Sequence, residues 1–387
     1  MGELEHMHYI ITSPENSSWF GGIFYNVPTE QEIDRINEII EEKCENLVEE
    51  KYAEDIDMYC EAMERLAQEL DLMEQTRCAF EFFLVEAVLQ YLLQEGYPIL
   101  VYGELAGSFI AYLLGITNFN PLASETRIDV NMVWKRRNGK IQPPNFSLGI
   151  ASIVRDGLNH FLNGTTPELY NIKANREIYK FISMPNNTWS WEIGELIRRT
   201  NSYYDNSISE KLSMNAFQTW VDERIDDYKK RMKNDRINKE LWKEDMLLIQ
   251  SMKNIGTVDR QTFVKLYAYL MMGYKGKKTL DKLNQTDFYV FEDDLFSALL
   301  DLDIPKEKAE EMVFDKKVYA PFSDGMTYVN QLADYDVPEN LLNYCSAVSS
   351  LWGKAPCISR VNMYYILEWY KQNYPVEYKE VVNGGII

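Results

Sequence analysis

The sequence has few cysteines and histidines, and none of them has the spacing of a metal site or a disulfide framework. The five cysteines contain no C-x-x-C pair, and His6 and His8, two of the three histidines, lie near the N-terminus. An odd number of widely spaced cysteines is typical of reduced thiols. We therefore expect no zinc ribbon, no disulfide framework and a cytoplasmic location.

Long apolar runs are also missing. The most apolar stretch, residues 99–116, is interrupted by Gly103, Glu104, Gly107 and Ser108, so it does not have the character of a membrane span. The first residues are acidic and polar where a signal peptide would be basic and then apolar. We therefore expect no membrane association.

Basic residues are outnumbered, with 40 Lys and Arg against 60 Asp and Glu and a formal net charge of −20. This balance opposes broad, non-specific attraction to nucleic acid, which depends on Lys and Arg. The acidity is concentrated in residues 30–71, which hold sixteen acidic and four basic residues, whereas residues 224–243 hold eight basic and four acidic residues. The total charge therefore leaves room for a local basic groove.

Apolar residues make up 46% of the chain and aromatic residues 13%, enough for a sizeable core and two to four domains. Thr29 and Glu32 have the spacing of a capping box, which predicts that a helix begins there. Further helical periodicity extends to Met73, and a second apolar helix is expected over residues 78–94, ended by Gly96.

The next segment alternates short elements. The sequence predicts a buried strand over residues 98–102, a small-residue turn over 103–108 and a helix over 109–114. Residues 127–134 alternate well enough for a strand, and residues 135–140 are typical of a hairpin turn.

The remainder is expected to be mostly helical. Trp189, Trp191, Trp220 and Trp242 are candidate core anchors. The expected helices of the C-terminal third span residues 258–272, 291–300, 306–314, 338–351 and 359–373.

Two segments resemble a known family. Residues 97–122 read YPILVYGELAGSFIAYLLGITNFNPL, which resembles the glycine-serine loop and the G-I-T-x-x-N-P-L pattern of the PolC-type bacterial DNA polymerase III alpha subunit. That family then carries D-I-D-x-N-F, whose carboxylates bind metal in the palm. The corresponding residues here are Arg127, Ile128, Asp129, Val130 and Asn131, so Arg127 replaces the first carboxylate.

The second similar segment is C-terminal and matches the family's fingers region as an ordered series. It comprises FEDDLF at residues 291–296, VPE at 337–339 with Cys345, GKAP at 353–356 and EWYKQNYP at 368–375. Residues 135–250 show no convincing match to the family's palm sequence, and the chain is too short for the family's further domains.

The resemblance implies an α+β fold, predominantly helical, with a small nucleotidyltransferase-type mixed-sheet palm and a helical fingers-like domain. The expected segments are an irregular or strand-containing leader at 1–28, an acidic helical segment at 29–96, a palm-like part at 97–165, a helical insertion or remnant palm at 166–250 and a fingers-like domain at 251–387.

Two-metal phosphoryl transfer needs carboxylates that hold two Mg²⁺ ions close together. Asp129 is the candidate catalytic residue and metal ligand if the chain is active, whereas Arg127 cannot be a ligand. On a strand the two would share a face and form an ion pair. Asp222 or Asp245 are candidates for a third carboxylate that the sequence does not assign.

The resemblance also implies nucleotide- or DNA-binding residues. Gly103, Gly107 and Ser108 keep part of a phosphate cradle, although Glu104 adds a repelling charge and tight packing explains the glycines equally well. Lys354 matches a family lysine that faces the incoming nucleotide, or it is a solvated loop residue.

Three functions remain open on the sequence. The favoured one is a divergent, truncated polymerase core that has lost catalysis and binds DNA, a nucleotide or a replication protein. The second is a minimal active DNA polymerase or nucleotidyltransferase that uses Asp129, relocated carboxylates and Mg²⁺. The third is an acidic interaction or DNA-mimic module built on residues 30–71. The sequence does not predict the oligomeric state.

Overall fold

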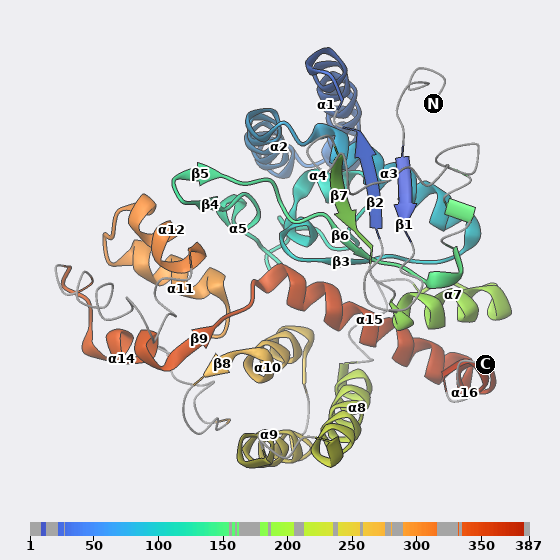
Figure 1. The fold of residues 1–387 in the computed structure, drawn as a ribbon, viewed down its shortest axis with the longest axis vertical. Coiled ribbons are helices and arrows are strands. Elements are labelled where there is room, and N and C mark those ends of the chain that lie inside the picture. The colour runs from blue at the N-terminus through green and yellow to red at the C-terminus, as the bar shows by residue number, and fades with distance from the viewer. Residues whose placement is uncertain are drawn as a thin grey trace. The chain divides into compact units, whose positions relative to one another are not determined.

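The computed structural model describes residues 9–12, 22–26, 28–154, 157–158, 161, 179–184, 187–204, 213–234, 239–255, 258–274, 280, 289–315, 332 and 335–382. The chain forms two compact units. Unit 1 comprises residues 1–134, 143–203 and 374–387, and unit 2 comprises residues 135–142 and 204–373. Figure 1 labels the helices and strands of both.

Unit 1 begins its helical part with α1 (Glu30–Tyr52), α2 (Ile56–Thr76) and α3 (Ala79–Glu95). The predicted capping box is confirmed, since the Thr29 side chain accepts from the Glu32 amide while the Glu32 carboxylate accepts from the Thr29 amide. One face of α1 is apolar and buried, and its members are Ile33, Ile36, Ile40, Cys44 and Val48. Burial of each isoleucine or valine side chain in this set stabilises the unit by roughly 1.5 to 3 kcal/mol.

Unit 1 also contains a five-stranded sheet. Its order is β1 (Tyr9–Thr12), β2 (Gly22–Asn26), β7 (Tyr179–Ser183), β6 (Ser147–Gly149) and β3 (Leu100–Tyr102). The β6–β7 pair is parallel and the other pairs are antiparallel, so the sheet is mixed. It joins two strands from the first 26 residues to the predicted strand β3.

The segment after β3 contains the motifs. A short 3₁₀ turn, η1 (Glu104–Gly107), leads into α4 (Phe109–Leu113), as the small residues and the apolar run predicted. The strand predicted over residues 127–134 is wrong. The structure has a short helix there, α5 (Val130–Val133), because the Asp129 side chain accepts a hydrogen bond from the Asn131 amide and caps it.

Unit 1 also contains η2 (Ser152–Val154), α7 (Thr188–Thr200) and α16 (Pro375–Val382), the last of which packs against α7. Arg199 of α7 pairs with Glu380 of α16 at 2.9 Å. The helix close to the C-terminus therefore belongs to unit 1, apart from the rest of the predicted C-terminal segment.

Unit 2 opens with the predicted hairpin, β4 (Arg136–Arg137) and β5 (Lys140–Ile141), whose turn has positive φ at Asn138 and Gly139. Its other elements are α8 (Ser213–Asn234), α9 (Lys239–Met252), α10 (Arg260–Met271), β8 (Gly273–Tyr274), α11 (Glu292–Asp301), α12 (Lys306–Phe314), α14 (Glu339–Ala347), β9 (Val348–Ser350) and α15 (Lys354–Asn373).

Unit 2 has an aromatic core where α15 packs against both α8 and α10. Trp220 is fully buried and its ring lies 5.4 Å from that of Phe263. Trp220 is therefore the core anchor that we predicted. Trp189 and Trp191 are half-buried, and the side chain of Trp242 lies outside the described residues.

The expected fold class, α+β and predominantly helical with a small mixed sheet, is confirmed. Among the described residues, no helix combines the length and the apolar character needed to cross a bilayer. The five functional segments expected from the resemblance stay a prediction.

Candidate functional site

The glycine-serine loop begins where β3 ends. Gly103 has φ +69° and ψ −155°, a backbone conformation that glycine adopts readily and residues with a Cβ avoid. A Cβ at this position would also lie only 3.1 Å from Cβ of Asn145. Ser108 then caps α4, since its hydroxyl accepts from the Ala111 amide at 3.2 Å. Both Gly107 and Ser108 are buried. The loop is thus a tight connection that faces the interior of unit 1.

A carboxylate from another helix occupies the donors of this loop. Glu69 of α2 is fully buried and accepts from the Ser108 hydroxyl at 2.6 Å, from the Phe109 amide at 2.9 Å and from the Ile110 amide at 3.3 Å. These are the groups with which a phosphate cradle would bind its anion. In this chain an internal anion holds them.

Arg65, one turn before Glu69 on α2, connects the loop with the second motif. Its Nε donates to Glu69 at 2.8 Å, and its Nη1 donates to the carbonyl of Ile128 at 2.7 Å. The guanidinium is buried, so both bonds form away from bulk water. Arg65 and Glu69 therefore fix the distance between the glycine-serine loop and the segment that carries Arg127 and Asp129.

Arg127 and Asp129 both line a pocket of about 260 Å³, but each has a different partner. The Arg127 guanidinium pairs with Glu61 at 2.7 Å, where the sequence had suggested Asp129. The Asp129 carboxylate accepts from the Asn131 amide at 2.7 Å and from the Asn131 side-chain nitrogen at 2.6 Å. The structure thus places the two residues together without pairing them as expected.

The donor set of this pocket does not suit two Mg²⁺ ions. Three carboxylates line it, those of Glu61, Glu64 and Asp129, but two guanidinium groups lie among them and one of these is paired with Glu61. A two-metal site needs several carboxylates that face the ions without competing cations. Across the described parts of the chain, no three His, Cys, Asp or Glu side chains are grouped as metal ligands.

The candidates for a third carboxylate lie in unit 2, whereas Asp129 lies in unit 1. Asp222 accepts hydrogen bonds from Lys253 and Gln218, and these bonds keep its pKa below the ordinary value although burial acts to raise it. Asp245 accepts from the Tyr228 hydroxyl at 2.9 Å. Asp222 of α8 therefore pairs with one residue of its own helix and one directly after α9, and Asp245 of α9 pairs with a residue of α8.

Lys354 also belongs to unit 2, where it is the first residue of α15. Its amide donates to the carboxylate of Asp293 at 2.8 Å, and burial raises the pKa of Asp293 to about 6. The prediction that Lys354 contacts phosphate has no test in this arrangement. Its position at the start of a long helix does distinguish it from the loop lysine that we considered.

Arg65 and Glu69, the residues that organise this site, were not predicted from the sequence. Their i,i+4 spacing is that of an ordinary surface ion pair on an acidic helix, which hid their role. One signal was present: on the apolar stripe of α2, Arg65 and Glu69 fall at the positions of buried residues beside Ala62, Leu66 and Met73.

The model of the bacterial DNA polymerase III alpha NTPase domain matches residues 38–257. The match includes the glycine-serine loop and the segment of Arg127 and Asp129. It also extends across residues 135–250, where the sequence had shown no convincing match to the family's palm. No curated protein matches the chain. The C-terminal series of motifs, which begins at residue 291, lies wholly beyond the matched range. Because the match covers more than half of the 387 residues, the chain belongs to the bacterial DNA polymerase III alpha family.

Proposed function

We propose that this chain is a divergent polymerase core that binds nucleic acid without extending it. The observation that carries the proposal is the network of α2: Glu69 holds the donors of the glycine-serine loop, and Arg65 ties that loop to the segment of Asp129. A triphosphate would need to displace a buried carboxylate that is itself paired with a buried guanidinium, and such displacement costs several kcal/mol.

The nucleic-acid part of the proposal rests on unit 2. Arg360 stacks 5.0 Å from the ring centre of Trp352, and the Trp352 ring lies 6.4 Å from that of Tyr267. Burial raises the pKa of Tyr267, and the nearby Arg360 and Arg224 act in the opposite direction with a smaller effect. Tyr267 is buried, whereas Trp352 and Arg360 are half-exposed, so these two side chains are the ones that a base can reach. A cation beside an aromatic ring suits single-stranded nucleic acid, because every base has a face that stacks.

Two lysines extend this group. Burial raises the pKa of Asp294, and the nearby Lys265 and Lys354 act in the opposite direction. Lys354 and Arg360 both lie on α15, and Lys354 follows Trp352 by two positions, so this end of α15 is the neighbourhood that the proposal assigns to nucleic acid. The net negative charge of the chain then confines binding to this neighbourhood.

Fluorescence anisotropy with a labelled single-stranded oligonucleotide tests the binding, with a salt titration to count the phosphates involved. We expect Arg360→Ala and Lys354→Ala each to weaken binding by roughly 3- to 30-fold, and Arg360→Ala to do so also at high salt, because it removes stacking as well as charge. Lys229→Ala on α8, whose amine pairs with Asp226, is the matched control. Absence of binding in the native chain at low salt would contradict the nucleic-acid part of the proposal.

Primer extension in the same samples tests the catalytic part. We expect no template-directed incorporation with Mg²⁺ or Mn²⁺. The alternative of a minimal active polymerase predicts incorporation that Asp129→Ala abolishes. A cytoplasmic location, expected from the cysteines, belongs to the same proposal.

A further inference from the structure

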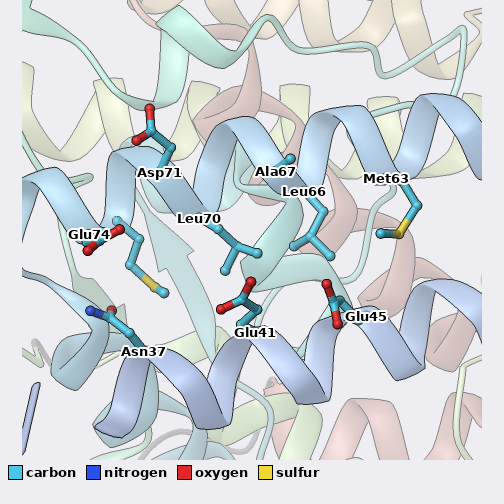
Figure 2. A pocket seen from close by; sticks show the side chains of 10 residues that line it. Asn37, Glu41, Glu45, Met63, Leu66, Ala67, Leu70, Asp71 and Glu74 are labelled. Carbon is cyan, nitrogen blue, oxygen red and sulfur yellow. The ribbon is translucent and has the colours of Figure 1, made fainter. Parts of the chain in front are cut away.

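A groove with an apolar floor and an acidic rim runs between α1 and α2 in unit 1. Its volume is about 270 Å³ and its lining residues are Asn37, Glu41, Glu45, Met63, Leu66, Ala67, Leu70, Asp71, Met73 and Glu74. Figure 2 shows Glu41 and Glu45 rising from one helix toward the apolar side chains of the other. None of these residues belongs to the loop or to the pocket of Asp129.

The floor of the groove is only partly covered. Leu66 and Met73 are buried, but Met63 and Leu70 are half-exposed and Ala67 is exposed. The volume is several times the share of about 30 Å³ that one water molecule takes in the liquid, and it lies below the range of roughly 300 to 1,000 Å³ typical of small-ligand pockets. The groove therefore suits one or two large apolar side chains of another protein segment.

The rim sets the charge of that segment. Glu41, Glu45, Asp71 and Glu74 are exposed, and no Lys or Arg is among the residues that line the groove. Such a rim repels the phosphates of nucleic acid and nucleotides and attracts Lys and Arg.

We infer that this groove binds a basic amphipathic helix of a partner protein, with one or two Leu, Ile or Met side chains on the floor and Lys or Arg side chains on the rim. This is the helix-in-groove mode of recognition. Half-exposed methionine suits it because its flexible thioether adapts to different apolar side chains. The inference goes beyond the proposed function, since it concerns a protein partner and a face of unit 1 that the nucleic-acid proposal does not use.

The probe is a fluorescein-labelled helical peptide of about 16 residues, composed of Leu and Lys with the leucines on one face. The control peptide has the same composition with the leucines scrambled. We expect saturable binding of the amphipathic peptide to the full chain, weakened by salt, and at least about tenfold weaker binding of the scrambled peptide. Failure of the amphipathic peptide to saturate below about 1 mM, or equal binding of both peptides, would overturn the inference.

Two pairs of variants locate the binding. Ala67→Trp fills the groove without changing charge, and Asn46→Trp places the same side chain on an exposed position of α1 away from it. We expect about tenfold or greater loss for Ala67→Trp and less than about twofold change for Asn46→Trp. If both variants lose affinity for the peptide equally, or if neither does, the peptide binds elsewhere and the inference is wrong.

The second pair changes charge. Glu41→Lys with Asp71→Lys reverses the rim, whereas Glu42→Lys with Glu49→Lys makes the same change in net charge on exposed positions outside the groove. The rim reversal should weaken binding at least about tenfold and the outer reversal less than about threefold. Equal effects would mean non-specific attraction to an acidic helix and would overturn the inference. Nucleic-acid binding of all four variants should stay unchanged, which separates this result from the proposed function.

Discussion

Glu69 and Ser108 are 39 positions apart in the sequence, yet the Glu69 carboxylate accepts a hydrogen bond from the Ser108 hydroxyl at 2.6 Å. The same carboxylate also accepts hydrogen bonds from the two backbone amides that follow Ser108. This contact explains why the glycine-serine loop can keep its shape without a bound phosphate. The anion that satisfies its donors comes from α2, and Arg65 compensates the charge of that anion.

Replacement of Glu69 should therefore be severe. We expect Glu69→Ala to lower the free energy of unfolding by about 3 to 5 kcal/mol, because it leaves the buried Arg65 guanidinium uncompensated and the loop donors unpaired. Urea denaturation followed by circular dichroism measures this loss. Glu64→Ala, at an exposed position of the same helix, should change stability by less than about 0.5 kcal/mol. A loss below about 1 kcal/mol for Glu69→Ala would contradict the account of the loop.

The glycine of the loop gives a second prediction. Gly103→Ala should destabilise unit 1 by about 1 to 3 kcal/mol, since the backbone conformation is one that alanine avoids and Asn145 leaves little room for a Cβ. Gly139→Ala is the matched control, because Gly139 also has positive φ but has nothing within 4 Å of an added Cβ. The alanine at position 103 should cost clearly more than that at 139, as thermal melts will show; equal costs would mean that the close approach of Asn145 is unimportant.

The buried pair of unit 2 can be tested by a double-mutant cycle. Nζ of Lys135 lies 2.5 Å from the carboxylate of Glu292, and both side chains are less than a tenth exposed. Lys135→Met alone should cost about 3 to 5 kcal/mol, because it leaves a buried carboxylate unpaired, whereas the double variant with Glu292→Leu should recover most of that loss. Additive losses in the double variant would show that the two residues stabilise the unit independently.

Asp293 predicts a pH dependence. Burial raises its pKa to about 6, above the value of an unfolded chain, so the folded state holds the proton more tightly. The contribution of this group to stability is then fully present below about pH 4 and is lost as the pH rises through 6. Asp293→Asn removes this dependence and retains an acceptor for the Lys354 amide.

Urea denaturation at pH 4.5 and pH 7.5 measures the effect. Because the side chain is partly exposed, we expect a shift of about 1 to 2 kcal/mol in favour of the Asn variant between the two pH values. A shift of the opposite sign would mean that the ionised carboxylate is stabilising at its place beside α15.

Elements determined by local chemistry could be predicted from the sequence. Thr29 with Glu32, Gly96 after α3, and Asn138 with Gly139 in the hairpin each specify a cap or turn within a few residues, and the structure confirms all three. The pattern at residues 127–134 misled because alternation over a short stretch does not reveal that Asp129 caps a helix.

The site itself depended on contacts that no local pattern encodes. Arg65 reaches Ile128, 63 positions away, and Glu69 reaches the loop at residues 108–110. The sequence shows these two residues as one more pair on an acidic helix. Both residues are buried because α2 packs against α4 and α5. In this buried position the pair connects the glycine-serine loop with the segment of Asp129.

Single-nucleotide primer extension with Mn²⁺ tests the central claim most directly, because Mn²⁺ tolerates imperfect ligand sets and detects residual chemistry. The native chain and Asp129→Ala are compared at high enzyme concentration on a primed template, with a nucleotide that the template does not encode as a control. We predict no incorporation above the control in either protein, since Glu69 holds the donors of the loop and Arg127 pairs with Glu61. Template-directed incorporation by the native chain that disappears in Asp129→Ala would contradict the account.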